Sequence, residues 1–159
     1  MATISSTAVS SKGVQTLAEL SALKSLNLAR TPVKDDVALS LLELKNLEEL
    51  DLSETSVGAG PRELVKLGSL PKLRRVDLSL TLANDGELES LASCENIEEL
   101  DLWGTPVSDA GIQHLHKMTQ LKRVGLFGTA VSDDAVAELK KALPEIIVVK
   151  GFDTVETTN

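Results

Sequence analysis

The chain has little of what a disulfide scaffold, a membrane anchor or a nucleic-acid surface would need. Its only cysteine is Cys94, which excludes an intramolecular disulfide and favours a reducing, cytoplasmic location. No apolar run approaches the roughly 20 residues of a membrane span, and residues 1–13 lack the charged start and apolar core of a signal peptide. The net charge of −8 argues against nucleic acid, because that binding depends on clustered Lys and Arg. We therefore expect neither a membrane partner nor a nucleic-acid partner.

The sequence also lacks a recognisable catalytic or metal-binding arrangement. His114 and His116 are two residues apart, which places them on different faces of a helix, so we expect no shared metal ion. Cys94 takes the same place in the repeat described below as a row of leucines, which predicts a buried thiol without reactivity. No Ser–His–Asp or Cys–His arrangement is visible. We predict no enzyme, no cofactor and no bound metal.

What the chain does contain is a repeat of about 24 residues. Residues 97–120 superimpose on residues 121–145, and the same line begins again upstream at Leu73, Leu47 and Leu23. Each line has apolar residues at positions one, four and six, then a threonine, then a short amphipathic run. In this pattern the chain resembles the leucine-rich repeat family over nearly its whole length. The resemblance implies a scaffold whose function depends on its exposed side chains.

The pattern predicts an α/β fold, a right-handed leucine-rich repeat solenoid. Alternation at positions three to seven predicts a short strand with positions four and six facing inward. Polar caps such as Ser108, Ser132 and Asp35 predict a helix in the second half of each repeat. The resulting horseshoe has a parallel β-sheet on its concave face and helices on its convex face.

We predict one domain over residues 1–159. The chain starts inside a repeat, which leaves two alternatives: a piece of a longer array, or an exposed apolar end face. The predicted divisions are a partial repeat at 1–22, repeats at 23–46, 47–72, 73–96, 97–120 and 121–145, and a terminal half-repeat with a tail at 146–159.

A column of threonines follows the strands and predicts buried hydroxyls. By resemblance to the asparagines of the family, these hydroxyls would bond neighbouring turns along the array. The column comprises Thr31, Thr55, Thr81, Thr105 and Thr129. In the fourth repeat Leu80 and Leu82 flank the threonine, which predicts either an exposed apolar spot or a local repacking.

The fifth position of the repeat predicts an acidic stripe on the exposed side of the sheet. The column contains Asn27, Asp51, Asp77, Asp101, Gly125 and Lys150. Parallel strands lie about 4.8 Å apart, so three carboxylates become neighbours. The stripe is either a solvated strand face or a site for Lys or Arg of a partner.

Positions two and three alternate in charge from repeat to repeat. The pairs are Lys24–Ser25, Glu48–Glu49, Arg74–Arg75, Glu98–Glu99 and Lys122–Arg123. Opposite charges on neighbouring strands predict a cross-strand ladder that holds the register. The ladder also breaks up any continuous basic patch.

The seventh position gathers every aromatic residue of the chain. Its column reads Ala29, Ser53, Ser79, Trp103, Phe127 and Phe152, and the chain has one Trp, two Phe and no Tyr. An exposed aromatic cluster is typical of an interaction surface. The alternative is that these rings pack on one another and cap the end of the solenoid.

Together these columns predict a non-catalytic module that binds a protein or peptide on its concave face. Trp103, Phe127 and Phe152 would anchor the partner, while Asp77, Asp101 and Glu99 would select a basic segment, with a cation–π contact at Trp103. The candidate binding residues are Trp103, Phe127, Phe152, Asp51, Asp77, Asp101, Glu99, Arg75 and Arg123.

Two alternatives remain from other functional classes. The chain could be a structural segment of a longer repeat array, or the substrate-reading domain of a ubiquitin-ligase-type adaptor. We expect a monomer or weak end-to-end self-association.

Overall fold

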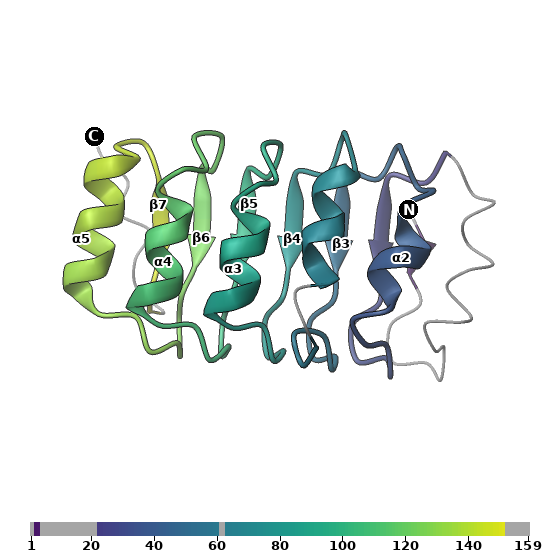
Figure 1. The fold of residues 1–159 in the computed structure, drawn as a ribbon, viewed down its shortest axis with the longest axis horizontal. Coiled ribbons are helices and arrows are strands. Elements are labelled where there is room, and N and C mark those ends of the chain that lie inside the picture. Colours follow the sequence, from purple (N-terminus) through teal and green to yellow (C-terminus); the bar gives the residue numbers. More distant parts are fainter. Residues whose placement is uncertain (1, 4–21, 61–62, 152–159) are drawn as a thin grey trace.

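The structure, a computed structural model, describes residues 2–3, 22–60 and 63–151. Most of the predicted partial repeat at 1–22, and Phe152 with the rest of the tail, lie outside the described residues. Strands in the described part form one parallel sheet of seven, in chain order (Figure 1). They are β1 (Ala2–Thr3), β2 (Ser25–Asn27), β3 (Glu49–Asp51), β4 (Arg75–Asp77), β5 (Glu99–Asp101), β6 (Arg123–Gly125) and β7 (Ile147–Val149).

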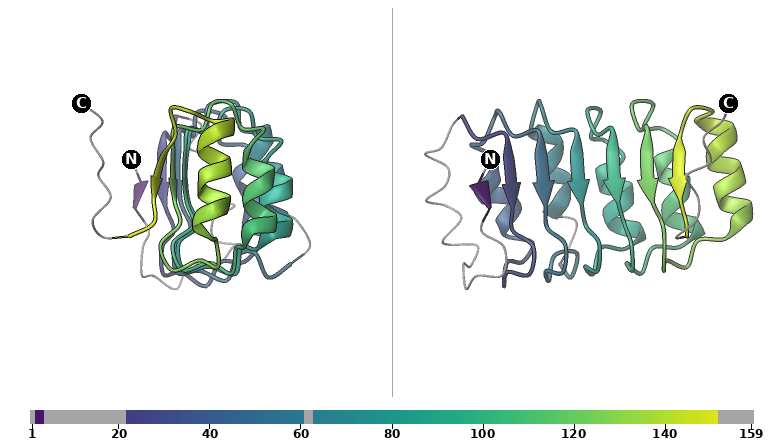
Figure 2. Two further views of the ribbon diagram at one scale, coloured as in Figure 1. Left: turned by 90° about the vertical axis from the view of Figure 1, so that its left-hand side faces the viewer. Right: turned by 180° about the vertical axis from the view of Figure 1, so that it is seen from behind.

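Helices form the second layer, and the end-on view in Figure 2 separates it from the sheet. They are α2 (Val37–Leu41), the 3-10 helix η2 (Glu63–Ser69), α3 (Asp85–Leu91), α4 (Asp109–Leu115) and α5 (Asp133–Ala142). The predicted right-handed solenoid, with strands on one face and helices on the other, is confirmed. The exposed side of the sheet is called the sheet face below.

The inward positions of the repeat build one continuous core. The fourth-position residues are buried from Leu26 in β2 to Val148 in β7, and the sixth-position leucines Leu28, Leu52, Leu78, Leu102 and Leu126 are fully buried. Burying a Leu side chain contributes about 1.5–3 kcal/mol. Because no single repeat can cover its own apolar stripe, this energy appears only when neighbouring repeats stack.

Four of the five threonines are buried as predicted and Thr129 is half-buried, but the bonds of the column run within each repeat. Thr105 Oγ1 donates to the carbonyl of Leu102 at 2.7 Å, and Thr31 Oγ1 donates to Leu28 at 2.6 Å. The prediction that these hydroxyls bond neighbouring turns along the array was wrong. A threonine side chain is too short to leave its own turn when a carbonyl three residues back is in reach.

Bonds between neighbouring turns come instead from aspartates at the helix starts. Asp85 accepts from the N–H and hydroxyl of Ser108, at 2.8 and 2.6 Å, and Asp109 does the same for Ser132. Ser108 and Ser132 cap α4 and α5, as predicted. Asp35 does not cap α2 and accepts instead from two N–H groups of the next repeat, those of Gly58 and Gly60.

The last strand lies one residue away from its predicted register. Ile147 pairs with Arg123, and Val149 pairs with Gly125. The fifth position of this repeat is therefore Val149, and by continuation the seventh is Gly151. The prediction of Lys150 at the fifth position was wrong, because four consecutive apolar residues, 146–149, show no alternation that would reveal the buried face.

Lys150 takes up a different role at this end of the array. It occupies the sixth position, which carries leucine in the upstream repeats. Its Nζ forms an ion pair with the carboxylate of Asp133, the first residue of α5. This pair links the last described strand to the last described helix.

Candidate functional site

Two aromatic rings lie side by side at the ends of β5 and β6. Trp103 and Phe127 have ring centroids 6.0 Å apart and planes inclined at 50°, within the range of favourable tilted pairs. Trp103 is 43% exposed. A Cβ atom at Gly128 would lie 3.5 Å from Trp103 Cδ1, so the indole ring rests over the backbone of the next turn. The pair leaves apolar surface open to solvent.

The slipped register of β7 places two more apolar side chains on the same face of the sheet as these rings. Ile147, which is 57% exposed, and Val149 both face the sheet side. We call Trp103, Phe127, Ile147 and Val149 the aromatic patch. Ile147 and Val149 were not among the predicted binding residues, although a strict 24-residue spacing from Arg123 and Gly125 places them on this face.

A shallow depression of about 170 Å³ lies within this patch. Its lining residues are Asp101, Trp103, Gly125, Phe127, Val149 and Gly151. Gly125 has no side chain where the upstream repeats have Asp or Asn, and a Cβ there would lie 2.5 Å from Asp101 Oδ1. Small-molecule pockets occupy about 300–1,000 Å³, so the depression suits a single side chain of a partner better than a cofactor.

The acidic stripe exists and has a structural role that the sequence did not reveal. Asp51, Asp77 and Asp101 are register partners on adjacent strands. One oxygen of each accepts from the backbone N–H two residues later; for Asp101 this donor is Trp103, at 3.1 Å. Asn27 makes the same bond to Ala29. The column therefore closes the turn at the end of each strand.

The charged form of Asp77, the central carboxylate of the stripe, is destabilised by its surroundings. Burial raises the pKa of Asp77, and the neighbouring charges of Asp101 and Asp51 raise it further, although hydrogen bonds from Ser79 act in the opposite direction. A cation placed near Asp77 and Asp101 by a partner would relieve this cost.

The predicted cross-strand ladder is present and centres on Arg75. Its guanidinium binds Glu99 through two hydrogen bonds of 2.9 and 3.0 Å and reaches Glu49 at 2.7 Å. The hydrogen bond from Arg75 holds the pKa of Glu99 below its usual value. Lys24–Glu48, Arg74–Glu98 and Lys122–Glu98 form a parallel row of ion pairs.

Arg123 lies at the edge of the aromatic patch and is the least engaged cation of the ladder. Its register partner, Glu99, is already bound by Arg75. Among the described residues its one ion-pair partner is Asp101, at 3.8 Å between Nη1 and Oδ2. This distance is too long for a hydrogen bond. Asp101 and Arg123 thus supply one charge of each sign beside the depression.

The structure brings some of the predicted binding residues together and separates others. Trp103, Phe127 and Asp101 line the depression, and Arg123 lies 3.8 Å from Asp101. Asp51, Asp77, Glu99 and Arg75 continue from it toward the N-terminal repeats. Phe152 lies outside the described residues.

Reactive chemistry is sparse in the described part of the chain. Cys94 is buried, and burial raises the pKa of its thiol to about 11, which keeps it protonated at neutral pH. Within the described ranges, no three His, Cys, Asp or Glu side chains converge as they would around a metal ion. None of the described helices combines the length and the apolar character needed to cross a bilayer.

Comparison with solved structures identifies the fold. Internalin C2 of Listeria monocytogenes superimposes with a TM-score of 0.64 at 27% identity, covering 87% of this chain and 56% of the internalin. A second internalin from the same bacterium, inlF, gives a TM-score of 0.65 at 15% identity over 92% of this chain and 46% of its own. The plant peptide hormone receptor RGFR1, solved in complex with RGF2, gives 0.54 at 18% identity over 86% of this chain and 22% of the receptor.

Sequence comparison gives a shorter match. Phytosulfokine receptor 1 of Arabidopsis thaliana is 40% identical over 52 residues, which is 33% of this chain and 5% of the receptor. No protein-family model matches the chain. This chain therefore spans a small part of the receptor and about half of the internalins. These neighbours are leucine-rich repeat proteins, and the family resemblance predicted from the repeat is confirmed.

Proposed function

We propose that this chain, which has the fold of leucine-rich repeat proteins, binds a protein or peptide partner on the sheet face, at the aromatic patch. The observation that carries the proposal is the half-exposed Trp103 at the rim of a depression floored by Gly125. Upstream seventh positions carry only Ala29, Ser53 and Ser79. Tryptophan is enriched among the residues that dominate binding energy, and this one has open apolar surface on a rigid scaffold.

The charges beside the patch favour a partner with a basic residue. Asp77 and Asp101 are neighbours on β4 and β5, and Trp103 follows Asp101 by two residues. Among the described residues, the one ion pair of these two carboxylates is that of Asp101 with Arg123, at 3.8 Å. A Lys or Arg of the partner would compensate both carboxylates and could contact the indole face. Glu99 contributes less than the sequence suggested, because Arg75 already occupies both of its oxygens.

The structural neighbours support protein or peptide binding in general. RGFR1 was solved with RGF2 bound, and its repeats share the fold of this chain. A scaffold of this kind presents a row of strand positions in register, so a partner can contact several repeats at once. The partner's identity and its basic segment are our inference from the patch and the stripe.

The test compares binding variants with a variant that leaves the sheet face intact. We would identify partners by affinity capture with the intact chain and then measure their affinity for Trp103→Ala and Phe127→Ala. Removal of a central aromatic anchor costs about 2 kcal/mol or more, so each variant should bind about 30-fold more weakly. Leu39→Ala on α2 removes an apolar side chain that is also exposed, at 51%, but lies in the helix layer, and this variant should bind normally.

A charge variant separates the acidic stripe from the aromatic anchor. Asp101→Asn removes the negative charge, and an amide oxygen can still accept from the Trp103 N–H, as Asn27 does for Ala29. A weaker affinity whose salt dependence is reduced would support recognition of a basic residue. Unchanged binding of Trp103→Ala and Phe127→Ala, with circular dichroism showing a native fold, would refute the proposal.

We also propose that the chain is a monomer in the cytoplasm. The location rests on the single cysteine. The outward residues of α5 at one end of the array include Asp134, Glu138, Lys140 and Lys141, all exposed. A polar surface of this kind disfavours stacking of another copy on α5. Sedimentation at increasing concentration tests this, because a self-stacking chain would grow in mass.

A further inference from the structure

An apolar ridge follows the edge where the strands end and the chain turns toward the helices. Leu80 and Leu82 are 45% and 51% exposed and flank the buried Thr81. Leu80 has a φ of 55°, in the left-handed region that a leucine rarely adopts. The equivalent residues of the other repeats, which are Arg30, Glu54, Gly104 and Gly128, have the same backbone conformation but carry polar side chains or none.

The ridge is continuous with the aromatic patch. The Leu80 N–H donates to the carbonyl of Trp103 at 2.6 Å. A Cβ at Gly104 would lie 2.5 Å from Leu80 Cδ2, so Leu80 rests over the residue that follows Trp103. Trp103 rests in the same way over Gly128. Leu80 and Trp103 therefore each pack against a glycine of the next repeat. We call Leu80, Leu82 and Trp103 the turn ridge.

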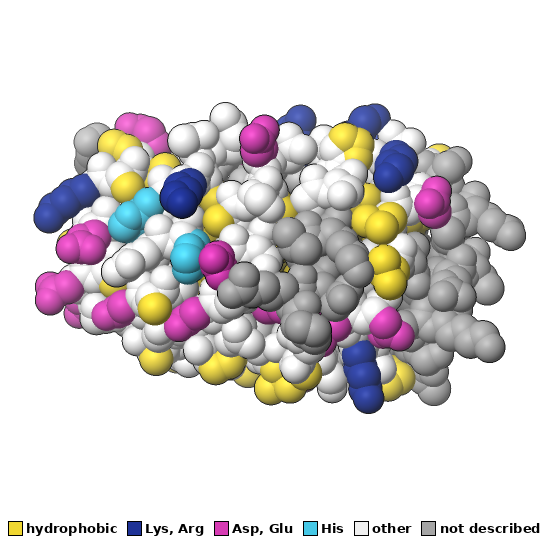
Figure 3. Space-filling model, in the orientation of Figure 1, with side chains coloured by type: hydrophobic (Ala, Val, Ile, Leu, Met, Phe, Trp, Pro, Cys, Tyr) yellow, Lys and Arg dark blue, Asp and Glu magenta, His cyan; other side chains and the backbone are white. Residues whose placement is uncertain are grey.

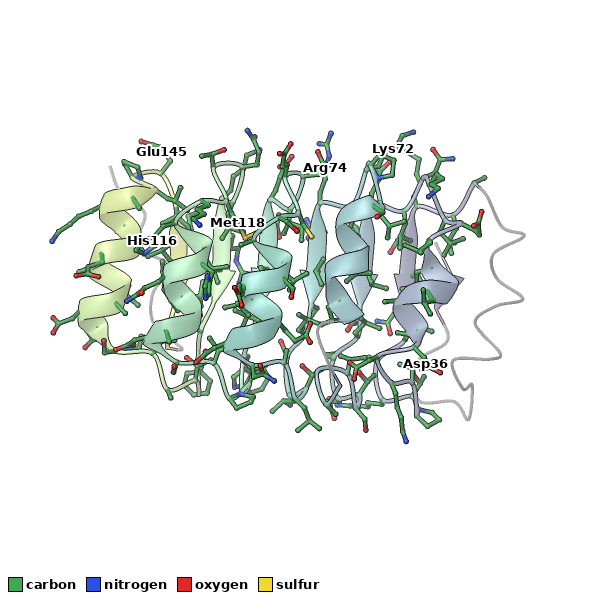
Figure 4. All side chains as sticks on the ribbon, viewed as in Figure 1. Asp36, Lys72, Arg74, His116, Met118 and Glu145 are labelled. Atoms are coloured by element: carbon green, nitrogen blue, oxygen red, sulfur yellow. The ribbon has the colours of Figure 1, made fainter. Side chains whose placement is uncertain are left out.

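The edge that carries the turn ridge differs from the opposite edge. Figure 3 shows hydrophobic side chains along the lower edge of the molecule, with acidic side chains above them and a basic side chain toward the N-terminal end of the edge. Asp36 lies at this edge, while Lys72 and Arg74 project from the opposite one (Figure 4). On the sheet face next to the ridge, Asp77 and Asp101 lie side by side on β4 and β5. These two carboxylates favour a basic residue in a partner that reaches the ridge.

We propose that the partner chain does not stay on the sheet face. A segment that combines apolar and basic side chains crosses from the aromatic patch over the ends of β5 and β4 and seats an apolar side chain between Leu80 and Leu82. The inference rests on the proposed function, because Trp103 is common to both surfaces. From β6 to β4 is two strand spacings, about 10 Å, which an extended chain covers in about three residues.

The test uses a defined probe and three variants. The probe is a fluorescein-labelled peptide in which Leu and Lys alternate, and its charge-reversed control alternates Leu and Glu. Leu80→Asn combined with Leu82→Ser removes the apolar ridge, while asparagine tolerates the left-handed backbone at residue 80. Trp103→Ala combined with Phe127→Ala removes the aromatic patch. Leu39→Ser is the matched control, because Leu39 is 51% exposed on the helix layer.

Fluorescence anisotropy then separates the outcomes. We expect the intact chain and Leu39→Ser to bind the Leu/Lys peptide equally, and the ridge variant to bind about tenfold more weakly because apolar contact is lost. A ridge variant that binds like the intact chain, while the patch variant fails, would overturn the ridge and leave the proposed function standing. Failure of the intact chain to prefer the Leu/Lys peptide over the Leu/Glu peptide would overturn both.

Discussion

Substituting the two glycines of the turn edge tests the packing of the turn ridge. Gly104 and Gly128 have φ values of 64° and 71°, so alanine is strained at both positions. Left-handed backbone costs an ordinary residue roughly 1–2 kcal/mol. Loss of glycine's freedom in the unfolded chain returns about 0.4–1 kcal/mol. On backbone grounds alone, each substitution should therefore lower the free energy of unfolding by about 1 kcal/mol.

The side chains packed over Gly104 and Gly128 make the expected losses of stability differ between the two substitutions. A Cβ at Gly128 would meet Trp103 Cδ1 at 3.5 Å, an ordinary contact, whereas a Cβ at Gly104 would meet Leu80 Cδ2 at 2.5 Å. Leu80 must then leave its rotamer, which costs about 0.5–1.5 kcal/mol. We expect Gly104→Ala to cost about 2 kcal/mol and Gly128→Ala about 1 kcal/mol.

The assay is urea denaturation followed by circular dichroism, with Leu80→Ala as a second background. Alanine at residue 80 removes the atom that Gly104→Ala would strike. The extra cost of Gly104→Ala should disappear in that background, giving a coupling of about 1 kcal/mol. Equal costs for the two glycine variants in the native background, together with no coupling to Leu80, would refute the packing of Leu80 over Gly104.

Three further predictions concern the ladder, the stripe and the core thiol. Arg75→Met should lower the free energy of unfolding by about 1 kcal/mol in low salt and by less in high salt, as denaturation at the two salt concentrations would show. Because the folded-state pKa of Glu99 is lowered, the contribution of the Arg75–Glu99 pair should also vanish as pH falls through that pKa. The free energy of unfolding of Asp77→Asn should compare best with that of the native chain at neutral pH. This gain in stability should shrink as pH falls through the raised pKa of Asp77, because the native carboxyl then becomes neutral. A stability difference that does not change with pH would contradict this. Cys94 should react with a thiol reagent only after denaturant is added, since it is buried and burial raises its pKa to about 11; rapid labelling of the folded chain would contradict its burial.

Much of the candidate site could be predicted from the repeat pattern. Strands in register place every fifth-position and seventh-position residue in a row, so the columns of Asp77, Asp101, Trp103 and Phe127 follow from counting alone. The alternating charges of Arg75 and its neighbours likewise predict the ladder that the structure contains. Periodicity is sufficient here because each strand contacts only its immediate neighbours.

Counting fails where the local sequence has no period of its own. Residues 146–149 are all apolar, so local alternation does not show which of them faces the core. The register places Val148 inward and Ile147 and Val149 on the sheet face, 24 residues after their partners in β6. The bonds from Asp35, Asp85 and Asp109 to the next repeat also escaped the sequence, because a helix-cap pattern does not distinguish a residue that caps its own helix from one that reaches its neighbour.

The sequence by itself determined the solenoid, the inward leucines and the row that brings Trp103 to Phe127, because these depend on a 24-residue period that neighbouring strands reproduce in register. The tertiary structure alone decided the left-handed backbone of Leu80, its position over Gly104 and the depression above Gly125. These features depend on the space that one repeat leaves for the next, and that space is a property of stacked backbones.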